Sequence, residues 1–515
     1  MTRTKSRGEN SVKNSLFAIV GQAVSLIFGF VTRIWFVREL GEAYLGVNGV
    51  FYSVLSLLSL TELGMGSAIT FALYRPIADG DEKRIGEIMN LYACAYRIVA
   101  GLVMLLGLAL LPFLGWITRE VPQVEHMTLI YLLFLVNSAA TYLFSYKRAL
   151  ITASQQDWRN TINTCAFSIL QNVVQLLLII TTRSFVLYLA AQLVCTLASN
   201  LAISHSAGKM FPYLRTVKGL PDRETTGSIL QNVKAMFVNR FGSIAVTGTD
   251  NLLIASIDVI LVGVYSNYLM VLQTIQTILT KVVEAVTASV GNLIASETGE
   301  KRLDVYRDIT FAVAWLYGFS AIALDTMSTR FITLAFGENM ELVQAAVHIM
   351  CVNFYLNGIR QPNLMYINAA GLFRPIRWKG FVEAAVNLGV SALFLWSGMG
   401  LFGVLLGTTV SHIATSLWWE PWCVQRHCLG RGAAAGFARQ NLICALVLAL
   451  TWWGTYALCA MLPGGWLGFF GAAAVTAILP NAVFTAVYHR SEPFAFFVGI
   501  LKRILGKFKR KGLPQ

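Results

Sequence analysis

Charged residues are scarce in this 515-residue sequence. Asp, Glu, Lys and Arg make up 13% of it, whereas 56% of the residues are hydrophobic and the mean hydropathy is +0.62. Soluble domains carry roughly 25% charged residues. The composition excludes a soluble globular protein, because a chain this apolar cannot cover its surface with polar groups. The alternating pattern of barrel strands is also absent, so the sequence predicts an all-α integral membrane protein.

Residue groupings that carry out chemistry are lacking too. The eight cysteines are scattered, and their only cluster with a histidine is Cys423, His427 and Cys428, which has no second ligand pair nearby. The six histidines are dispersed, and we find neither a Ser/His/Asp grouping nor a glycine loop for phosphate. We therefore expect no enzyme activity, no metal and no cofactor. A membrane polymerase or ligase would also need a large outer loop with catalytic residues, and the loops here are too short.

A cleavable signal peptide is not expected, because the first apolar run, 15–37, is too long for the core of one. Runs of about 20 apolar residues mark helical membrane spans, and the sequence predicts fourteen. They cover 15–37, 44–74, 90–117, 127–146, 160–181, 185–204, 229–257, 259–295, 309–329, 341–365, 380–396, 400–422, 437–462 and 466–488.

Lys and Arg are unevenly distributed over the connections between these spans. With the N-terminus inside, the inner segments and the C-terminal tail hold 30 of the 40 Lys and Arg, and the outer segments hold only Arg38, Arg119, Arg183 and Arg330. Cytoplasmic loops are enriched in basic residues. The pattern predicts an even number of spans, with both termini in the cytoplasm. It also accounts for the net charge of +14, so that charge does not indicate a nucleic-acid partner.

The longest inner segment divides the chain into two halves. We expect an N-terminal six-helix bundle at 1–206, a cytoplasmic linker at 207–228, a second six-helix bundle at 229–425, two additional helices at 426–490 and a basic amphipathic tail at 491–515. A faint internal repeat supports the division, because Lys13 and Gly21 have the same spacing as Lys234 and Gly242. The tail has an apolar face and a basic face, which predicts a helix on the inner leaflet.

Ionisable residues also fall inside the predicted spans. A charge at the bilayer centre costs about 2.5–3.5 kcal/mol on insertion scales, so such residues usually face a bundle interior or a watery cavity. The acidic residues are Glu62, Asp250, Glu284 and Asp325. The basic residues are Arg33, Arg97, Lys234, Arg240, Lys281 and Arg360.

Each basic residue has a less specific interpretation as well. Arg97, Lys281 and Arg360 lie towards inner span ends, where long side chains reach the interface, and Lys234 has the same alternative. Lys281 can also pair with Glu284 one turn away. Arg240 is the best candidate for an aqueous cavity, followed by Arg33, which lies in the outer third of its span and could also reach the outer interface. Several arginines around one cavity favour an anion, because the guanidinium fork matches the geometry of phosphate.

Three blocks resemble a known family. They are "ELGEAYLGVNGVFYSVLSLLSLTELGMGSAITFALYRPIADGDEKRI" at 39–85, "YSNYLMVLQTIQTILTKVVEAVTASVGNLIASE" at 265–297 and "NAAGLFRPIRWKGFVEAAVNLGVSALFLWSGMGLFGVLLGTTVSH" at 368–412. They are similar to the O-antigen and capsular polysaccharide flippases of the multidrug/oligosaccharidyl-lipid/polysaccharide (MOP) exporter superfamily. The resemblance covers roughly residues 10–421.

This resemblance implies two six-helix bundles around a central cavity that opens alternately to each side of the cytoplasmic membrane of a bacterium. It implies an oligosaccharide on a polyprenyl pyrophosphate as substrate, moved from the inner to the outer leaflet, with a polysaccharide polymerase and glycosyltransferases as potential partners. Cationic cavity residues would bind the substrate. Two alternatives remain: a lipid II flippase, and a multidrug or cation antiporter that would use Glu62, Asp250 and Asp325 to bind the coupling ion.

Overall fold

The computed structural model describes residues 7–58, 65–117, 124–143, 146–154, 156–296, 299–370, 372, 375–429, 434–495 and 498–499, and every regular element among them is a helix. Contacts divide the chain into two units, which meet between Val264 and Tyr265 inside helix α11 (Val259–Ser296). The prediction of an all-α membrane protein is confirmed. The predicted bundle boundaries and the amphipathic tail stay predictions, and most of that tail lies outside the described residues.

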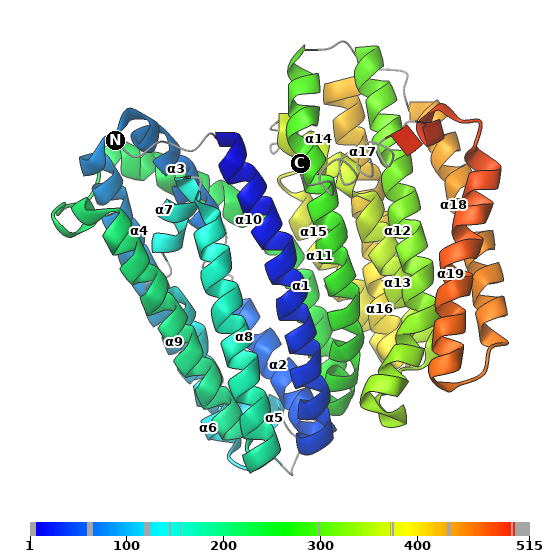
Figure 1. The fold of residues 1–515 in the computed structure, drawn as a ribbon, viewed down its shortest axis with the longest axis horizontal. Helices are drawn as coiled ribbons and strands as arrows, with labels where there is room; N and C mark the ends of the chain where they lie inside the picture. The colour runs from blue at the N-terminus through cyan, green and yellow to red at the C-terminus, as the bar shows by residue number, and fades with distance from the viewer. Residues whose placement is uncertain are drawn as a thin grey trace, which may run out of the picture. The chain divides into compact units, whose positions relative to one another are not determined.

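The first unit is a bundle of helices in which segments far apart in the sequence pack together, as α1 does with α8. Figure 1 shows α1, α8 and α9 lying alongside one another, and each packs on the next. The major helices of this unit are α1 (Arg7–Leu40), α2 (Glu42–Leu58), α3 (Met65–Asp79), α4 (Glu82–Ala109), α6 (Met127–Tyr142), α7 (Lys147–Ala153), α8 (Asp157–Thr182), α9 (Phe185–Met210) and α10 (Arg223–Ala255).

Short polar side chains begin several of these helices. Asp81 accepts a hydrogen bond from the Arg84 amide at 2.9 Å at the start of α4, and Asp222 accepts one from the Thr225 amide at 2.6 Å at the start of α10. These bonds satisfy amides that have no partner within the helix. The backbone bond from Thr225 to the charged carboxylate lowers the pKa of Asp222. Gly80, at φ +70°, supplies the left-handed residue that the turn before α4 requires.

The second unit contains long helices and several interrupted ones. Two π-helical turns, His412–Ser416 and Gln425–Leu429, flank α17 (Leu417–Val424). The other major helices are the rest of α11, α12 (Gly299–Phe336), α13 (Gln344–Ile359), α14 (Gln361–Ala370), α15 (Lys379–Trp396), α16 (Gly400–Ser411), α18 (Ala434–Ala460) and α19 (Gly465–Tyr488).

Nine helices among the described residues are long and apolar enough to cross a membrane, or ten if α6 and α7, which meet at 42°, form one bent span. These ten coincide with ten of the fourteen predicted spans. The other four predicted spans fall on α1, on α2 with α3, on α10, and on α13 with α14. The first three include residues or side chains outside the described set, and α13 has only 16 residues. The total of fourteen therefore stays a prediction.

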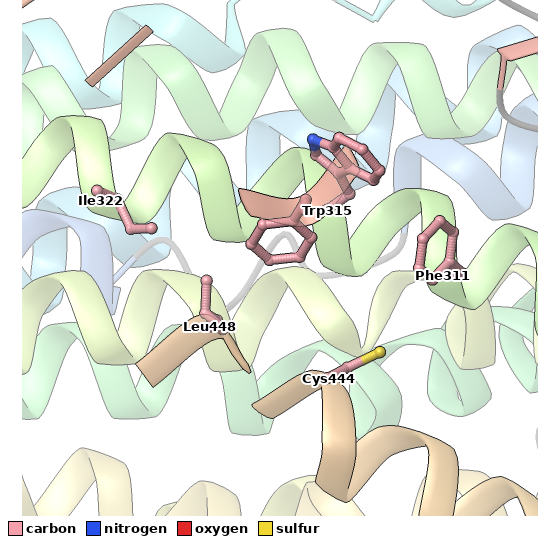
Figure 2. Packing of buried hydrophobic residues seen from close by; sticks show 6 residues of the cluster. Phe311, Trp315, Ile322, Cys444 and Leu448 are labelled. Atoms are coloured by element: carbon pink, nitrogen blue, oxygen red, sulfur yellow. The ribbon is translucent and has the colours of Figure 1, made fainter. Parts of the chain in front are cut away.

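Helix α12 anchors the two C-terminal helices. Figure 2 shows Phe311, Trp315 and Ile322 of α12 facing Cys444 and Leu448 of α18 in one buried cluster, which Phe484 of α19 completes. Polar contacts accompany this apolar core, because the Trp315 indole donates to Asn481 at 2.9 Å and the Thr326 and Thr476 hydroxyls lie 3.0 Å apart. The additional helices are thus packed into the second unit.

Arg330, near the C-terminal end of α12, binds the C-terminal end of α18. Its guanidinium donates to the carbonyl oxygens of Cys459 at 2.7 Å, Leu462 at 3.2 Å and Pro463 at 2.8 Å, which belong to the end of α18 and the turn that follows. Carbonyls at a helix C-terminus have no partner within the helix. A cation there satisfies them and complements the negative end of the helix dipole.

Helices α2 and α11 approach each other through two glycines in the first unit. A Cβ atom added to Gly46 would overlap the Val259 carbonyl oxygen, and one added to Gly263 would lie 2.7 Å from the Gly46 amide nitrogen. The obstructing atoms belong to backbone, so no side-chain rotation could make room. Glycine therefore allows this crossing because it has no side chain.

We expect Gly46→Ala to destabilise the protein, because one extra methyl group forces two packed helices apart. Overpacking typically costs about 1–3 kcal/mol. Thermal unfolding in detergent should show a lower midpoint. The matched control is Gly101→Ala in α4, where an added Cβ meets no atom within 4 Å. Equal midpoints for Gly46→Ala and the control would show that the close approach is not required.

Candidate functional site

A cavity of about 590 Å³, lined by both polar and apolar groups, lies within the first unit. Residues of α3, α4, α6, α7, α8 and α9 line it, so it is built from one unit alone. Its lining combines one cation, Arg148, with aromatic residues such as Tyr92 and Tyr142 and with hydroxyl and amide groups such as Thr164 and Asn200. Most ligand pockets have volumes of about 300–1,000 Å³, so the cavity is large enough for a small ligand.

Arg148 reaches across the cavity from the short helix α7 to α8 and α9. Its guanidinium donates to the Thr164 hydroxyl at 2.7 Å, to the Ser199 hydroxyl at 3.1 Å and to the Asn200 side-chain oxygen at 3.4 Å. All three acceptors are neutral. The nearby carboxylate of Asp157 interacts with Arg148 electrostatically, but it accepts its hydrogen bonds from Thr152 and Asn160.

Asn160 holds α7 and α8 in this arrangement. Its amide nitrogen donates to the Arg148 carbonyl oxygen at 3.0 Å, to the Thr152 hydroxyl at 3.1 Å and to Asp157 at 2.9 Å. Asn200 does the same for α9, because its amide donates to the Ala140 carbonyl oxygen at 2.9 Å near the end of α6. Networks of this kind position the side chains that line a cavity.

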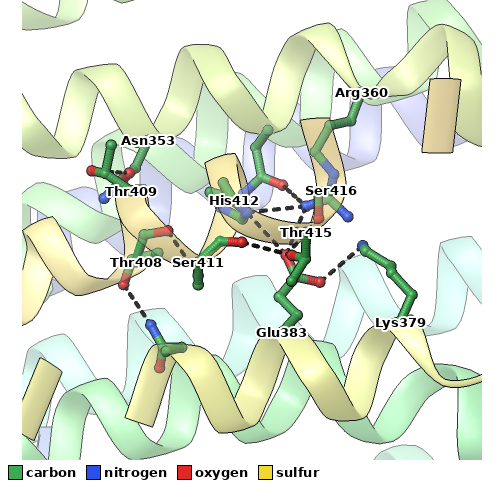
Figure 3. Close-up of polar contacts among 12 residues, drawn as sticks. Asn353, Arg360, Lys379, Glu383, Thr408, Thr409, Ser411, His412, Thr415 and Ser416 are labelled. Carbon is green, nitrogen blue, oxygen red and sulfur yellow. Dashed lines mark hydrogen bonds and ion pairs between the residues drawn. The ribbon is translucent and has the colours of Figure 1, made fainter. Parts of the chain in front are cut away.

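A buried cluster of charges forms the polar centre of the second unit. We call Arg360, Lys379, Glu383, His412 and Glu420 the ion cluster; each is at most 8% exposed. Glu420 accepts from Arg360 Nη2 at 2.7 Å and Nε at 3.2 Å, and from Lys379 at 2.6 Å. Figure 3 shows Arg360, Lys379 and His412 converging on Glu383.

Glu383 is the second acceptor of the cluster. Its oxygens lie 2.8 Å from Lys379 Nζ and 3.5 Å from Arg360 Nη1, and 2.9 Å from His412 Nδ1, while the Ser416 hydroxyl donates at 2.7 Å. Two cations and two carboxylates balance when the histidine is neutral. A balanced and hydrogen-bonded cluster can remain buried, whereas removal of one partner leaves an uncompensated charge.

A smaller polar group links α12, α13 and α18. The Asp325 carboxylate contacts His348 Nδ1 at 2.7 Å through one oxygen and accepts from the Trp452 indole at 2.7 Å through the other. The imidazole of His348 packs against the ring of Tyr456, with ring centres 4.8 Å apart. Asp325 is buried and His348 is partly exposed. This predicted ion-coupling residue therefore has a titratable partner.

The predicted residues of the first unit occupy different environments. Arg33 is half-buried in α1, close enough to Tyr188 of α9 for an electrostatic interaction. Arg97 is exposed on α4, and Asp250 is buried near the end of α10. Lys234 and Arg240 also belong to α10, but their side chains lie outside the described set, as does the whole of Glu62.

The predicted residues of the second unit are Lys281, Arg360 and Asp325. Lys281 is exposed on α11, and the side chain of Glu284 is not among those described. Arg360 does not lie at the lipid interface, because two carboxylates hold it in the ion cluster. The structure thus brings Arg360 together with charges that the sequence analysis did not consider. The substrate-binding and ion-coupling roles of all these residues stay predictions.

Sequence analysis missed Arg148 and four residues of the ion cluster. Arg148 falls in the predicted inner connection between the spans at 127–146 and 160–181, and nothing in its neighbours marks it as a cavity residue. Two signals for the cluster were present. Lys379 and Glu383 are four residues apart, which places them on one helix face, and Glu420 interrupts the apolar run "SLWWEPW".

Comparisons with known proteins find solved structures of similar fold but no matching sequence family. No protein-family profile matches the chain, and no curated protein matches it. Three similar solved structures are the lipid II flippase MurJ in an inward closed conformation, an inward-facing multidrug resistance MATE family transporter of the MOP superfamily, and the MATE transporter VcmN of Vibrio cholerae.

The likeness to these structures extends over most of each chain. The lipid II flippase has 12% sequence identity and a TM-score of 0.66, and the match covers 92% of this chain and 99% of that one. The inward-facing transporter has 14% identity, a TM-score of 0.60 and coverage of 79% and 98%. VcmN has 14% identity, a TM-score of 0.56 and coverage of 83% and 99%. At such identities the comparisons show the fold alone, which this chain shares with these three structures.

We expect Arg360→Leu to destabilise the second unit strongly. The substitution leaves two buried carboxylates with only Lys379 as a full countercharge, and breaking a buried pair costs about 3–5 kcal/mol. The unfolding midpoint in detergent should fall well below that of Arg377→Ala, which removes an exposed arginine two residues before α15. The double variant Arg360→Leu/Glu420→Gln should recover part of the loss. A midpoint for Arg360→Leu equal to that of the control would contradict a structural role.

Proposed function

We propose that this protein is a flippase that moves a polyprenyl-pyrophosphate-linked oligosaccharide from the inner to the outer leaflet of the bacterial cytoplasmic membrane, for polysaccharide export. The observation that carries the proposal is the agreement of two independent likenesses. Three sequence blocks resemble polysaccharide flippases, and the fold matches that of a lipid II flippase along nearly the whole chain.

The coverage of the matches favours a lipid flippase over a drug antiporter. The match to the lipid II flippase leaves 8% of the chain uncovered, which is about 41 of the 515 residues. Helices α18 and α19 have 27 and 24 residues, so the uncovered part is too short to contain both of them. That match therefore includes part of the two additional helices. The match to the multidrug transporter covers only 79% of the chain. The sequence blocks in turn favour a polysaccharide precursor over lipid II.

The proposed mechanism is alternating access of the two bundles around a cationic passage. Arg33 and Arg240 would bind the pyrophosphate while the polyprenyl tail remains in the bilayer. Lys234, Arg97, Lys281 and Arg360 are secondary candidates for this role, and Glu62, Asp250 and Asp325 are candidates for binding a coupling ion. Arginine suits the task because it offers two parallel hydrogen bonds to one phosphate.

We expect Arg240→Ala to abolish export of surface polysaccharide in a complemented deletion strain, at an unchanged level of protein in the membrane. Arg240→Lys should retain part of the activity, because charge is kept but the bidentate fork is lost. Arg240→Glu should retain none. Arg75→Ala, which removes an exposed arginine of α3 that is not a candidate headgroup ligand, is the control. Normal export by Arg240→Ala at equal expression would reject Arg240 as a headgroup ligand.

The charge distribution also predicts the orientation of the chain. In a version in which Ser replaces all eight cysteines, Lys218→Cys in the central linker should resist a membrane-impermeant thiol reagent applied to intact cells. Glu338→Cys, in a predicted outer connection, should react. Both positions are exposed, so accessibility within the protein does not limit labelling. Labelling of Lys218→Cys from outside the cell would show that the linker is not cytoplasmic and would contradict the predicted orientation.

A further inference from the structure

The cavity of the first unit has an electrostatic feature that distinguishes it from the ion cluster. Arg148 carries a full positive charge, yet its three hydrogen-bond acceptors, Thr164, Ser199 and Asn200, are neutral. Within the described residues, no carboxylate forms a salt bridge with it. The Asp157 carboxylate is engaged by Thr152 and Asn160. The guanidinium therefore presents charge to the cavity that its protein partners only partly offset.

A hydrogen bond to a charged acceptor is roughly twice as strong as one to a neutral acceptor. An anion in the cavity would thus be preferred to the hydroxyls of Thr164 and Ser199 as a partner for Arg148. The long arginine side chain can turn towards such a ligand without loss of the bonds from Asn160 that hold α7 on α8. Phosphate fits this donor best, because its oxygens match the guanidinium fork.

The rest of the cavity wall is suited to a hydroxyl-rich group. Tyr92 and Tyr96 lie with their hydroxyls 3.0 Å apart, and the ring of Tyr142 packs against Tyr96 with centres separated by 5.9 Å. Thr196 and Gln171 contribute further polar groups. The tyrosine rings are each at most 5% exposed, so they form a firm wall of the cavity, while the hydroxyl and amide groups beside them can bond to the hydroxyls of a sugar.

The position of the cavity agrees with such a ligand. Arg148 belongs to a connection that the charge distribution assigns to the cytoplasm, and lipid-linked sugars begin the proposed reaction at the inner leaflet. All lining residues lie between Thr70 and Asn200, so the site does not depend on the second unit.

We propose that this cavity binds a glycosyl phosphate, with the phosphate on Arg148 and the sugar between the tyrosines and α8. The chemistry follows from the lining residues, whereas the choice of a lipid-linked source rests on the proposed flippase function. The same group could come from a soluble sugar phosphate, so the two sources are tested separately.

The first experiment measures binding of soluble ligands to the purified full-length protein by the shift of its thermal unfolding midpoint. A ligand that binds only the folded state raises this midpoint. Glucose 1-phosphate should raise it more than inorganic phosphate or glucose at equal concentration. Arg148→Ala should weaken binding at least tenfold and Arg148→Lys less. The control Arg159→Ala, which removes an arginine outside the cavity on α8, should bind like the parent protein.

A second variant keeps the test decisive if Arg148→Ala does not fold. Thr196→Phe fills the cavity without removing any of the three acceptors of Arg148, and it should also abolish the shift. Unchanged binding by Thr196→Phe would overturn the proposal. Shifts of equal size from glucose 1-phosphate and inorganic phosphate would overturn it too, because the cavity would then recognise only an anion.

The second experiment identifies the source of the ligand in lipid nanodiscs. Polyprenyl-pyrophosphate-linked N-acetylglucosamine should stabilise the parent protein more than Arg148→Ala, which keeps Arg33 and Arg240, whereas phosphatidylglycerol should stabilise neither. Equal stabilisation by phosphatidylglycerol would reject the site in favour of a phospholipid headgroup.

A shift with glucose 1-phosphate but none with the lipid-linked sugar would keep the glycosyl phosphate site and reject its lipid-linked source. The two proposals can fail separately. If Arg240→Ala loses export but no ligand raises the unfolding midpoint of the parent protein, the cavity site is rejected and the flippase proposal stands.

Discussion

A charge that is removed from water must be compensated within the protein, and this constraint governs the polar interior of both units. In a chain with 13% charged residues and a mean hydropathy of +0.62, each ionisable group inside a helix bundle needs a partner or a hydrated space. The ion cluster illustrates full compensation. Arg360 and Lys379 face Glu383 and Glu420 at distances of 2.6–3.5 Å, so the opposite charges cancel within one group of side chains.

The cavity around Arg148 shows the other arrangement. Neutral oxygens accept its hydrogen bonds, and the site retains a positive charge that a ligand could complement. The two arrangements therefore suit different tasks. Complete pairing favours a rigid structural centre, because every partner is already occupied. Incomplete compensation beside a cavity favours binding, because an anion would improve the hydrogen bonds that Arg148 makes.

Helix α12 connects these electrostatic requirements with the packing of the second unit. One part of it carries Asp325, whose two oxygens contact residues of α13 and α18, and another part carries the aromatic cluster around Trp315. Its end holds the carbonyl oxygens after α18 through Arg330. The two additional helices are thus fixed to the unit at three levels by apolar and polar contacts. A function of Asp325 in ion coupling would therefore involve these helices as well.

The sequence by itself determined the membrane character, the helical class and the position of ten apolar spans, because hydrophobicity and helical length are local properties. It also indicated a MOP-type exporter through the three blocks at 39–85, 265–297 and 368–412. It could not show which charges meet. Arg360 and Glu420 are 60 residues apart, and Arg148 contacts Asn200 across 52 residues. Those pairings depend on how α14, which begins directly after Arg360, packs against α17 and how α7 packs against α9, so only the tertiary structure decided that Arg360 is paired and that Arg148 lines a cavity.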